Sequence, residues 1–241
     1  MKAFLTKTFA LLFIATLSTS CMIDGINSVS GNRNVKTETR KINDDFTKID
    51  VGQGIEVFIT QGSDTKLVLE ADENLHKLIK TEVSNGVLKI YSKRNIWRAK
   101  AKKVYITASR INAIKASSGA DVNSENTINT DTFEIHTSSG ADARIDVNAD
   151  TVNSSASSGS DLRIKGKANH HSAKATSGSS IKAYNLKSKN VTVKVSSGAN
   201  IDVNATEFLN ARASSGGDID YRGNPKKINK KTSSGGSVSG H

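Results

Sequence analysis

Apolar and polar residues alternate along most of the chain from Phe46 onward, a pattern typical of strands with one buried face. Residues 46–51, 55–60 and 66–70 each show this alternation. Residues 72–79 instead carry apolar side chains at helical spacing and begin with acidic residues, so they predict a short helix. Asn85-Gly86 stands between two alternating segments and predicts a hairpin, because a type I′ turn needs positive φ at both central positions.

A repeat of about 19 residues governs the second half of the chain. Seven glycines mark it, each preceded by Ser-Ser or, once, by Thr-Ser, at spacings of 21, 19, 19, 20, 18 and 19 residues. Copies of this length are typical of a solenoid, in which one coil cannot bury its apolar side alone. We expect a tight corner at each glycine, which needs either positive φ or space that a Cβ would fill. The corner glycines are Gly119, Gly140, Gly159, Gly178, Gly198, Gly216 and Gly235.

Aligning the copies on the glycine separates inward from outward positions. Small or apolar residues stand three before, one after and three after the glycine, and a serine stands immediately before it. Because alternate side chains of a strand point to one face, we expect these four columns to line the interior. Parallel coils stack at about 4.8 Å, whereas an O–H···O bond spans about 2.7–2.8 Å. The serine hydroxyls are therefore expected to bond turn backbone or trapped water rather than one another.

Two outward columns carry charge, and two interpretations fit them. Either the basic side chains are solvated and the Asp, Asn and Ser residues cap the turn, or the basic column binds an extended anionic polymer. Four residues before the glycine stand Lys115, Lys174, Lys194, Arg212 and Lys231, with His136 and Ser155 between the first two. Two residues after it stand Asp121, Asp142, Asp161, Ser180, Asn200, Asp218 and Ser237.

The N-terminus has the pattern of an exported chain. Lys2 and Lys7, an apolar run over 9–17 and three small residues predict a signal peptide over residues 1–21. Cys21 stands where a bacterial lipoprotein carries its lipid, although Leu17 is one position further from it than usual; a plain secretory signal is the alternative. The apolar run is shorter than the roughly 20 residues of a membrane span. Residues 22–43 are rich in Asn, Ser, Gly and charge, and they predict a flexible tether.

Composition fits a thin, exported solenoid. Only 36% of the 241 residues are hydrophobic and 5% aromatic, which suits a narrow coil filled by small side chains. A single cysteine excludes a disulfide framework and a Cys-based zinc site. The net charge of +11, about +9 without the two leader lysines, favours acidic partners such as envelope polysaccharide or lipid headgroups.

Catalytic and metal sites are not expected. The five histidines include no pair at zinc spacing, and we expect His170-His171 to lie in a loop. Asp142 and Asp161 would lie within acid/base distance on adjacent coils, but their recurrence in the repeat favours a structural role. The chain has no phosphate-binding or nucleophile motif. We expect no cofactor, and no nucleic-acid binding because the chain is exported and its aromatic residues are scattered.

The sequence resembles a known family over about residues 42–238. The matching segments are Phe46-Thr47-Lys48-Ile49, residues 52–62, residues 69–75, residues 85–90 and the Ser-Ser-Gly-Ala-Asp repeats. Together they resemble the putative auto-transporter adhesin, head GIN domain family. The resemblance implies a right-handed parallel β-helix in secreted or lipid-anchored envelope proteins, with no established catalytic residues. Glu56 stands where the family's eponymous Gly-Ile-Asn has Asn.

We therefore predict one elongated all-β domain. A less regular β portion over 44–110, with one short helix, precedes a parallel β-helix-like solenoid of about seven coils over 111–238. The leading hypothesis for function is a non-catalytic envelope adhesin, an outer-membrane lipoprotein held through Cys21 and facing either the periplasm or the surface. It would present its ladders of side chains to an anionic glycan or an envelope protein. The alternatives are an envelope assembly protein stacking through solenoid ends, and a glycan-cleaving enzyme using the Asp column. The sequence leaves the oligomeric state open.

Overall fold

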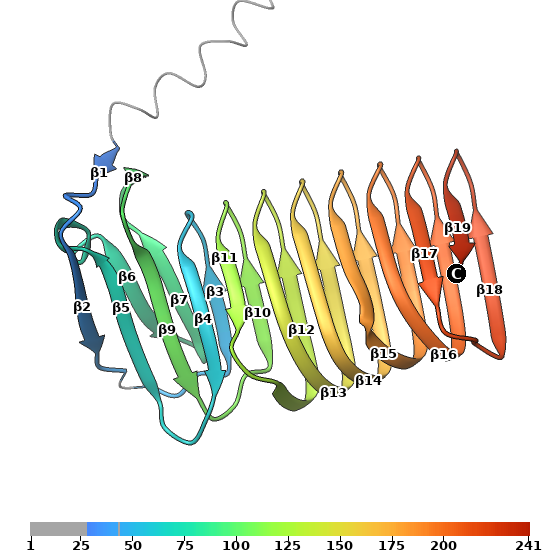
Figure 1. Ribbon diagram of the computed structural model, residues 1–241, viewed down its shortest axis with the longest axis horizontal. Helices are drawn as coiled ribbons and strands as arrows, with labels where there is room; N and C mark the ends of the chain where they lie inside the picture. The colour runs from blue at the N-terminus through green and yellow to red at the C-terminus, as the bar shows by residue number, and fades with distance from the viewer. Residues whose placement is uncertain (1–27, 43) are drawn as a thin grey trace, which may run out of the picture.

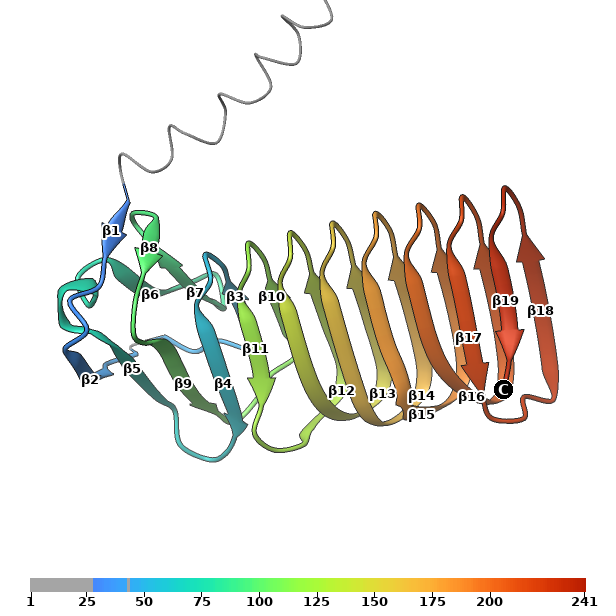
Figure 2. The ribbon, with the colours of Figure 1, turned by 45° about the horizontal axis from the view of Figure 1, so that its top comes forward.

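The computed structural model describes residues 28–42 and 44–241 and forms an all-β solenoid of about seven turns, as predicted (Figure 1). Most coils contain one long bent strand, paired in parallel with the strands of the coils before and after it. The stack therefore extends along a single axis, with tight turns at one edge and rounded bends at the other (Figure 2). The coil strands are β10 (Ala113–Ala116), β11 (Asp121–Ser124), β12 (Ile128–Thr137), β13 (Asp142–Ala156), β14 (Asp161–Ala175), β15 (Ser180–Val195), β16 (Asn200–Ala213), β17 (Asp218–Arg222), β18 (Lys227–Thr232) and β19 (Ser237–Gly240).

The N-terminal portion continues this ladder and then caps it. Strands β3 (Lys48–Val51) and β4 (Glu56–Gln61) pair in parallel with β10 and β11. Strands β7 (Val87–Ser92) and β9 (Lys102–Ala108) add one more parallel layer beyond them. Antiparallel strands then cover that layer, with β6 (Ile79–Ser84) on β7 and β5 (Lys66–Asp72) on β9. The hairpin predicted at Asn85-Gly86 is confirmed, with φ of 52° and 71° at the two residues.

The prediction of a tether over 22–43 is wrong for residues 28–42. Strand β2 (Val35–Arg40) pairs antiparallel with β5, and β1 (Val29–Ser30) pairs with β8 (Ile96–Arg98). His76 helps to hold β2, because its Nδ1 lies 2.8 Å from Glu38 Oε2. The remainder of the predicted tether, together with the predicted signal peptide and Cys21, lies outside the described residues.

The predicted helix over 72–79 is reduced to a single 3-10 turn, Glu73–Leu75. Strand β5 runs up to Asp72 and β6 begins at Ile79, so little chain is left between them for a helix. The Asp72 carboxylate does not cap the turn but accepts backbone N–H bonds from Arg33, Lys100 and Ala101 at 2.9–3.0 Å. Burial alone would raise the pKa of Asp72, but these backbone bonds lower it below its ordinary value.

The corner of each coil is a type I′ turn. At Ser118-Gly119 the φ angles are 51° and 71°, and the Ala120 amide donates to the Ser117 carbonyl at 3.1 Å. A Cβ placed on Gly119 would meet no atom within 4 Å, so positive φ rather than lack of space explains the glycine. The same pair of angles recurs at the other six corners.

Three of the four predicted inward columns line the interior. Buried residues stand three before, one after and three after each corner glycine up to Ile219, while the last coil is more exposed. The serine immediately before each glycine is exposed at all seven corners, so its inward placement is wrong. The reason is geometric: two consecutive residues with positive φ form the turn, and strand alternation does not continue through it.

No helix within residues 28–42 and 44–241 combines the length and apolar character needed to cross a membrane.

Replacing a corner glycine is expected to destabilise the solenoid through backbone conformation alone. Gly159 has φ 67° and open space at its Cβ position. Gly159→Val should therefore lower the free energy of unfolding by about 1–3 kcal/mol, the usual cost of a non-glycine residue held in a sparsely populated region. Gly159→Asn is the control and should lose less, because Asn tolerates positive φ. Urea unfolding tests this, and a Val variant as stable as the native chain would refute the turn assignment.

Candidate functional site

The predicted basic column forms in register on the face that precedes the tight turns, here called the pre-turn face. Lys115 pairs with His136, and the column continues through Ser155 to Lys174, Lys194, Arg212 and Lys231. Its first member is neutralised, because Lys115 Nζ lies 3.6 Å from Asp50 Oδ2. His136 Nδ1 bonds Ser155 Oγ at 2.6 Å. Four cations therefore occupy consecutive coils, and Lys115 stands apart from them.

The acidic column lies on the opposite, post-turn face. Glu56 stands at its head, followed in register by Asp121, Asp142 and Asp161. The expected capping of the turns by these side chains is not found among the described residues. Asp121 instead accepts from Asn123 at 2.9 Å and pairs with Arg144 at 3.3 Å. Asp142 and Asp161 are direct register partners, as the enzyme hypothesis required.

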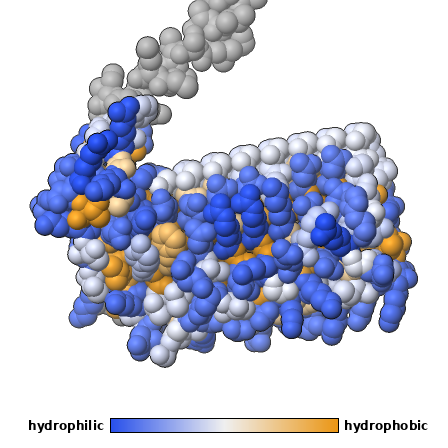
Figure 3. Space-filling view, in the orientation of Figure 1, coloured by the Kyte–Doolittle hydropathy of each residue, from blue (hydrophilic) through white to orange (hydrophobic). Residues whose placement is uncertain are grey.

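The exposed serines and glycines of the corners form a ridge along the narrow edge. Figure 3 shows it as a pale row, neither strongly hydrophilic nor hydrophobic. Its backbone is bonded between coils: the Gly119 amide donates to the Ser139 carbonyl at 3.1 Å, and the pattern repeats along the edge. Within the described residues, the hydroxyls of this serine column have no hydrogen bond, so the expected bonds to turn backbone are absent.

The histidines do not gather into a metal site. His170 and His171 lie in strand β14 and not in a loop as expected. His241 pairs with Asp220 at 3.1 Å, and His76 and His136 are bound as described above. Across the described part of the chain, no group of three or more His, Cys, Asp or Glu side chains is placed to hold a metal ion.

His171 is a titratable group buried in the core of the coil. It takes the inward position that Val152 and Val191 hold in the neighbouring coils. Its Nε2 lies 2.9 Å from Ser154 Oγ, and its Nδ1 has no hydrogen-bond partner among the described residues. Burial lowers the pKa of His171 to about 4, because the charged ring would lose its hydration.

The His171 ring should make the fold sensitive to acid. Between pH about 4 and 6.5 the unfolded chain binds a proton at His171 that the folded chain does not bind. Stability contributed by the neutral ring is therefore complete above pH 6.5 and is lost as pH falls toward 4, by about 3 kcal/mol in total. The double variant Ser154→Ala/His171→Val should flatten this slope, whereas His170→Gln should leave it unchanged. Urea unfolding between pH 4 and 7.5 measures it, and equal slopes in all three proteins would contradict the prediction.

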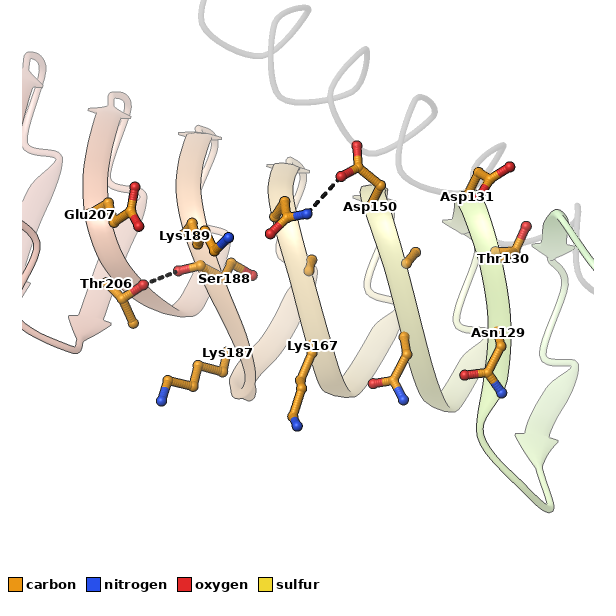
Figure 4. Close-up of a pocket in the computed structure, with 14 residues that line it drawn as sticks. Asn129, Thr130, Asp131, Asp150, Lys167, Lys187, Ser188, Lys189, Thr206 and Glu207 are labelled. Atoms are coloured by element: carbon orange, nitrogen blue, oxygen red, sulfur yellow. Dashed lines mark hydrogen bonds between the residues drawn. The ribbon is translucent and has the colours of Figure 1, made fainter.

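A groove runs along the rounded edge, and we call it the edge groove (Figure 4). It has a volume of about 970 Å³ and crosses β12 to β16. At about 4.8 Å per coil, the groove is about 20 Å long. Its floor consists of small side chains in register, namely Thr130, Ala149, Ala168 and Ser188.

Two rows of polar side chains form the walls of the edge groove. One wall is Asn129, Asn148, Lys167 and Lys187, held in register by the ladder. The other wall lies at the bend of each coil and changes along the axis from acidic to basic and back. Its residues are Asp131, Asp150, Asn169, Lys189 and Glu207.

Hydrogen bonds fix parts of this second wall. Asn169 donates to Asp150 at 2.7 Å, and this bond lowers the pKa of the Asp150 carboxyl. Thr206 donates its hydroxyl to the Ser188 carbonyl at 3.2 Å. Figure 4 shows Lys167 and Lys187 side by side on neighbouring strands, and both side chains are exposed. The edge groove thus offers amides, carboxylates and ammonium groups along a straight line.

A second groove, of about 800 Å³, lies on the post-turn face. Phe58 stands at one end, stacked on Tyr105 with ring centroids 5.1 Å apart, and Tyr184 stands at the other. Burial, followed by the nearby Asp220, raises the pKa of Asp202 beside Tyr184. Figure 3 shows strongly hydrophilic side chains gathered over the middle coils of this face. Between the aromatic residues a row of cations is held in register: Arg144, Arg163 and Lys182.

Neither groove was found from the sequence alone. The cation row of the post-turn groove could have been read four residues after the corner glycines, where Arg144, Arg163 and Lys182 follow one another. The edge groove gives a weaker signal, because no single residue type continues along the bends: Asp131 and Asp150 are followed by Asn169, Lys189 and Glu207.

Comparisons with known proteins agree with this fold. The family model described as putative auto-transporter adhesin, head GIN domain, matches residues 45–225. A putative adhesin from Bacteroides fragilis superposes with a TM-score of 0.83 at 23% identity, over 89% of this chain and 100% of that chain. A putative lipid binding protein from Parabacteroides distasonis gives 0.72 at 21% identity, over 89% and 99%. A putative adhesin from Parabacteroides merdae gives 0.67 at 20%, again over 89% and 99%. At these identities the likeness establishes a shared fold. No curated protein matches the sequence.

Proposed function

This chain belongs to the putative auto-transporter adhesin, head GIN domain family, and on that premise we propose that it is a non-catalytic binding protein of the bacterial envelope. Its ligand is an extended glycan that carries acidic groups and lies along the edge groove. Lipidation of Cys21 would hold the protein on the outer membrane. The family and the adhesin descriptions of its structural neighbours support an envelope or extracellular location.

The observation that carries the proposal is the straight, polar edge groove across β12 to β16. A glycan is a linear chain of hydroxyl-bearing rings, and amide and carboxylate side chains at regular spacing can bond successive hydroxyls. The small floor residues allow close approach of a sugar ring. Lys167, Lys187 and Lys189 gather in the adjoining coils and supply charge-assisted bonds for acidic substituents.

The lining of the edge groove favours a glycan over a lipid or an apolar peptide. Within the described residues that line it, alanine is the largest purely apolar side chain. The exposed carbon of the lining belongs to alanines and to the stems of polar side chains, so an acyl chain or a hydrophobic peptide anchor would find no bulky apolar side chain to pack against. The putative lipid binding protein from Parabacteroides distasonis therefore supports the fold of this chain, and its described ligand is not carried over.

End-to-end assembly of solenoids is less well supported. The C-terminal end exposes strand β18, whose one described partner is β16, so an unpaired edge is present. That strand and the residue before it carry four lysines, Lys226, Lys227, Lys230 and Lys231. Lysines on an edge strand oppose pairing with another edge, because like charges would meet.

The proposal is tested with two double variants that remove the same charge from the same two coils. Lys167→Gln/Lys187→Gln alters the edge groove, and Lys174→Gln/Lys194→Gln alters the basic column of the pre-turn face. Binding to an array of acidic and neutral polysaccharides, followed by calorimetry on the hits, should show at least a tenfold loss for the first variant, because each hydrogen bond to a charged group contributes about 1.5–3 kcal/mol. The second variant should bind like the native chain.

Each other outcome has a definite meaning. A loss confined to Lys174→Gln/Lys194→Gln would move the ligand to the basic column and refute the edge groove. Absence of any saturable glycan binding by the monomer would refute the proposed function. Turnover of a polysaccharide that is lost in Asp142→Asn or Asp161→Asn would show an enzyme instead.

A further inference from the structure

The end of the molecule where the chain emerges carries an exposed tryptophan. Trp97, the only tryptophan of the chain, lies in β8 with 65% of its surface exposed. The other large hydrophobic residues exposed in the described chain, Ile228 and Tyr105, are 40% and 37% exposed. An indole ring in this situation suits a membrane interface, where its apolar body and its polar N–H are both accommodated.

Positive charge surrounds Trp97. Residues 93–103 contain no Asp or Glu, and the exposed side chains beside the tryptophan are Lys93, Arg94, Arg98 and Lys100. Two carboxylates lie nearby, fewer than these four cations: Asp72 is buried against backbone amides, and Glu73 accepts from the Asn34 amide at 2.7 Å. Figure 3 shows strongly hydrophilic side chains at this end, next to where the chain emerges.

The chain leaves the fold at this same end. Strand β1 pairs with β8, and Ser28, the first described residue, immediately precedes it. Figures 1 and 2 place β1 and β8 together, beyond the stacked coils and at the opposite end from β18 and β19. Cys21 and Ser28 are seven positions apart in the sequence, so even fully extended chain spans at most about 25 Å between them.

Hydrogen bonds hold residues 30–33, where the chain leaves the fold, close to the segment that carries Trp97. The carboxylate of Asp72 accepts N–H bonds from Arg33 on one side and from Lys100 and Ala101 on the other. Asn74 adds bonds to the same exit, accepting from the Asn32 amide and donating to the Ser30 carbonyl, both at 2.9 Å. Whatever holds the N-terminus near a membrane would therefore also hold Trp97 near it.

We infer that this end is a membrane-docking surface for anionic lipid headgroups. Trp97 enters the headgroup region, and Lys93, Arg98 and Lys100 contact lipid phosphates. Strands β1 and β8 lie toward the tight-turn side of the molecule, and the edge groove lies at the rounded bends on the other side, so docking leaves the groove accessible (Figure 1). This inference concerns residues outside the edge groove and stands whether or not that groove binds glycan.

Vesicle binding of the chain from residue 22 onward, which contains every strand that the structure describes and no acyl chain, tests the inference. Because Trp97 is the sole tryptophan, its emission reports directly on this surface. Vesicles of phosphatidylglycerol and phosphatidylethanolamine should shift the emission to the blue and co-sediment the protein, while phosphatidylcholine vesicles should do neither. Trp97→Ala should weaken sedimentation with the anionic vesicles.

A matched pair of variants separates docking from general charge attraction. Arg98→Gln/Lys100→Gln should weaken binding to the anionic vesicles at least tenfold, since each cation near such a surface contributes about fivefold. Lys174→Gln/Lys194→Gln removes the same charge on the pre-turn face and should leave binding unchanged. Equal loss in both variants, or sedimentation without a blue shift, would overturn the inference, as would absence of binding.

Discussion

The link between successive corners is the interaction on which the rest of the structure depends. At each of the seven corners serine and glycine both adopt positive φ, and at all but the last the glycine amide donates to the serine carbonyl of the next coil at 3.1 Å. The first link comes from Gly54, before the recognisable repeats begin. Holding a serine in this region is unfavourable, and the inter-coil bond together with the strand ladders offsets that cost. Because the same two backbone atoms, a glycine N and a serine O, are joined between every pair of neighbouring coils, the link fixes each coil in register with the next.

Because the coils stack in strict register, the residue types at equivalent positions determine the columns and grooves on the surface. The same position of each coil lies above its equivalent in the previous one, so a lysine repeated at one position becomes a column, and small residues become the floor of a groove. The ladder shifts locally in β15, where the pairing passes from Ala183–Val203 directly to Lys187–Asn204. Both grooves include residues of this region, Tyr184 in the post-turn groove and Lys187 in the edge groove. Function at these surfaces is thus expected to depend on departures from the repeat more than on the repeat itself.

Features that recur with the repeat could be predicted from the sequence, whereas features outside the repeat could not. The spacing of the glycines predicts the coils, three of the four inward columns and the register of Lys174 with Lys194, because one period describes them all. Strand β2 could not be predicted, because most of its residues are exposed. Its sequence therefore lacks the alternation of apolar and polar residues that marks a strand with one buried face. The exposed serines were misplaced because a two-residue turn interrupts the strand period. The edge groove depends on side chains at the bends, where the residue type changes along the stack from Asp131 and Asp150 to Asn169, Lys189 and Glu207.

Backbone amide hydrogen exchange at the corner glycines tests the central claim, that inter-coil links lock the register. These glycines lie at an exposed edge, where an isolated turn would exchange quickly. The account predicts slow exchange at Gly119, Gly140, Gly159, Gly178, Gly198 and Gly216, each of which donates to the following coil. Gly235 belongs to the last coil and should exchange fast, which makes it an internal reference. Fast exchange at all seven glycines would contradict the account, because the corners would then form without holding their neighbours.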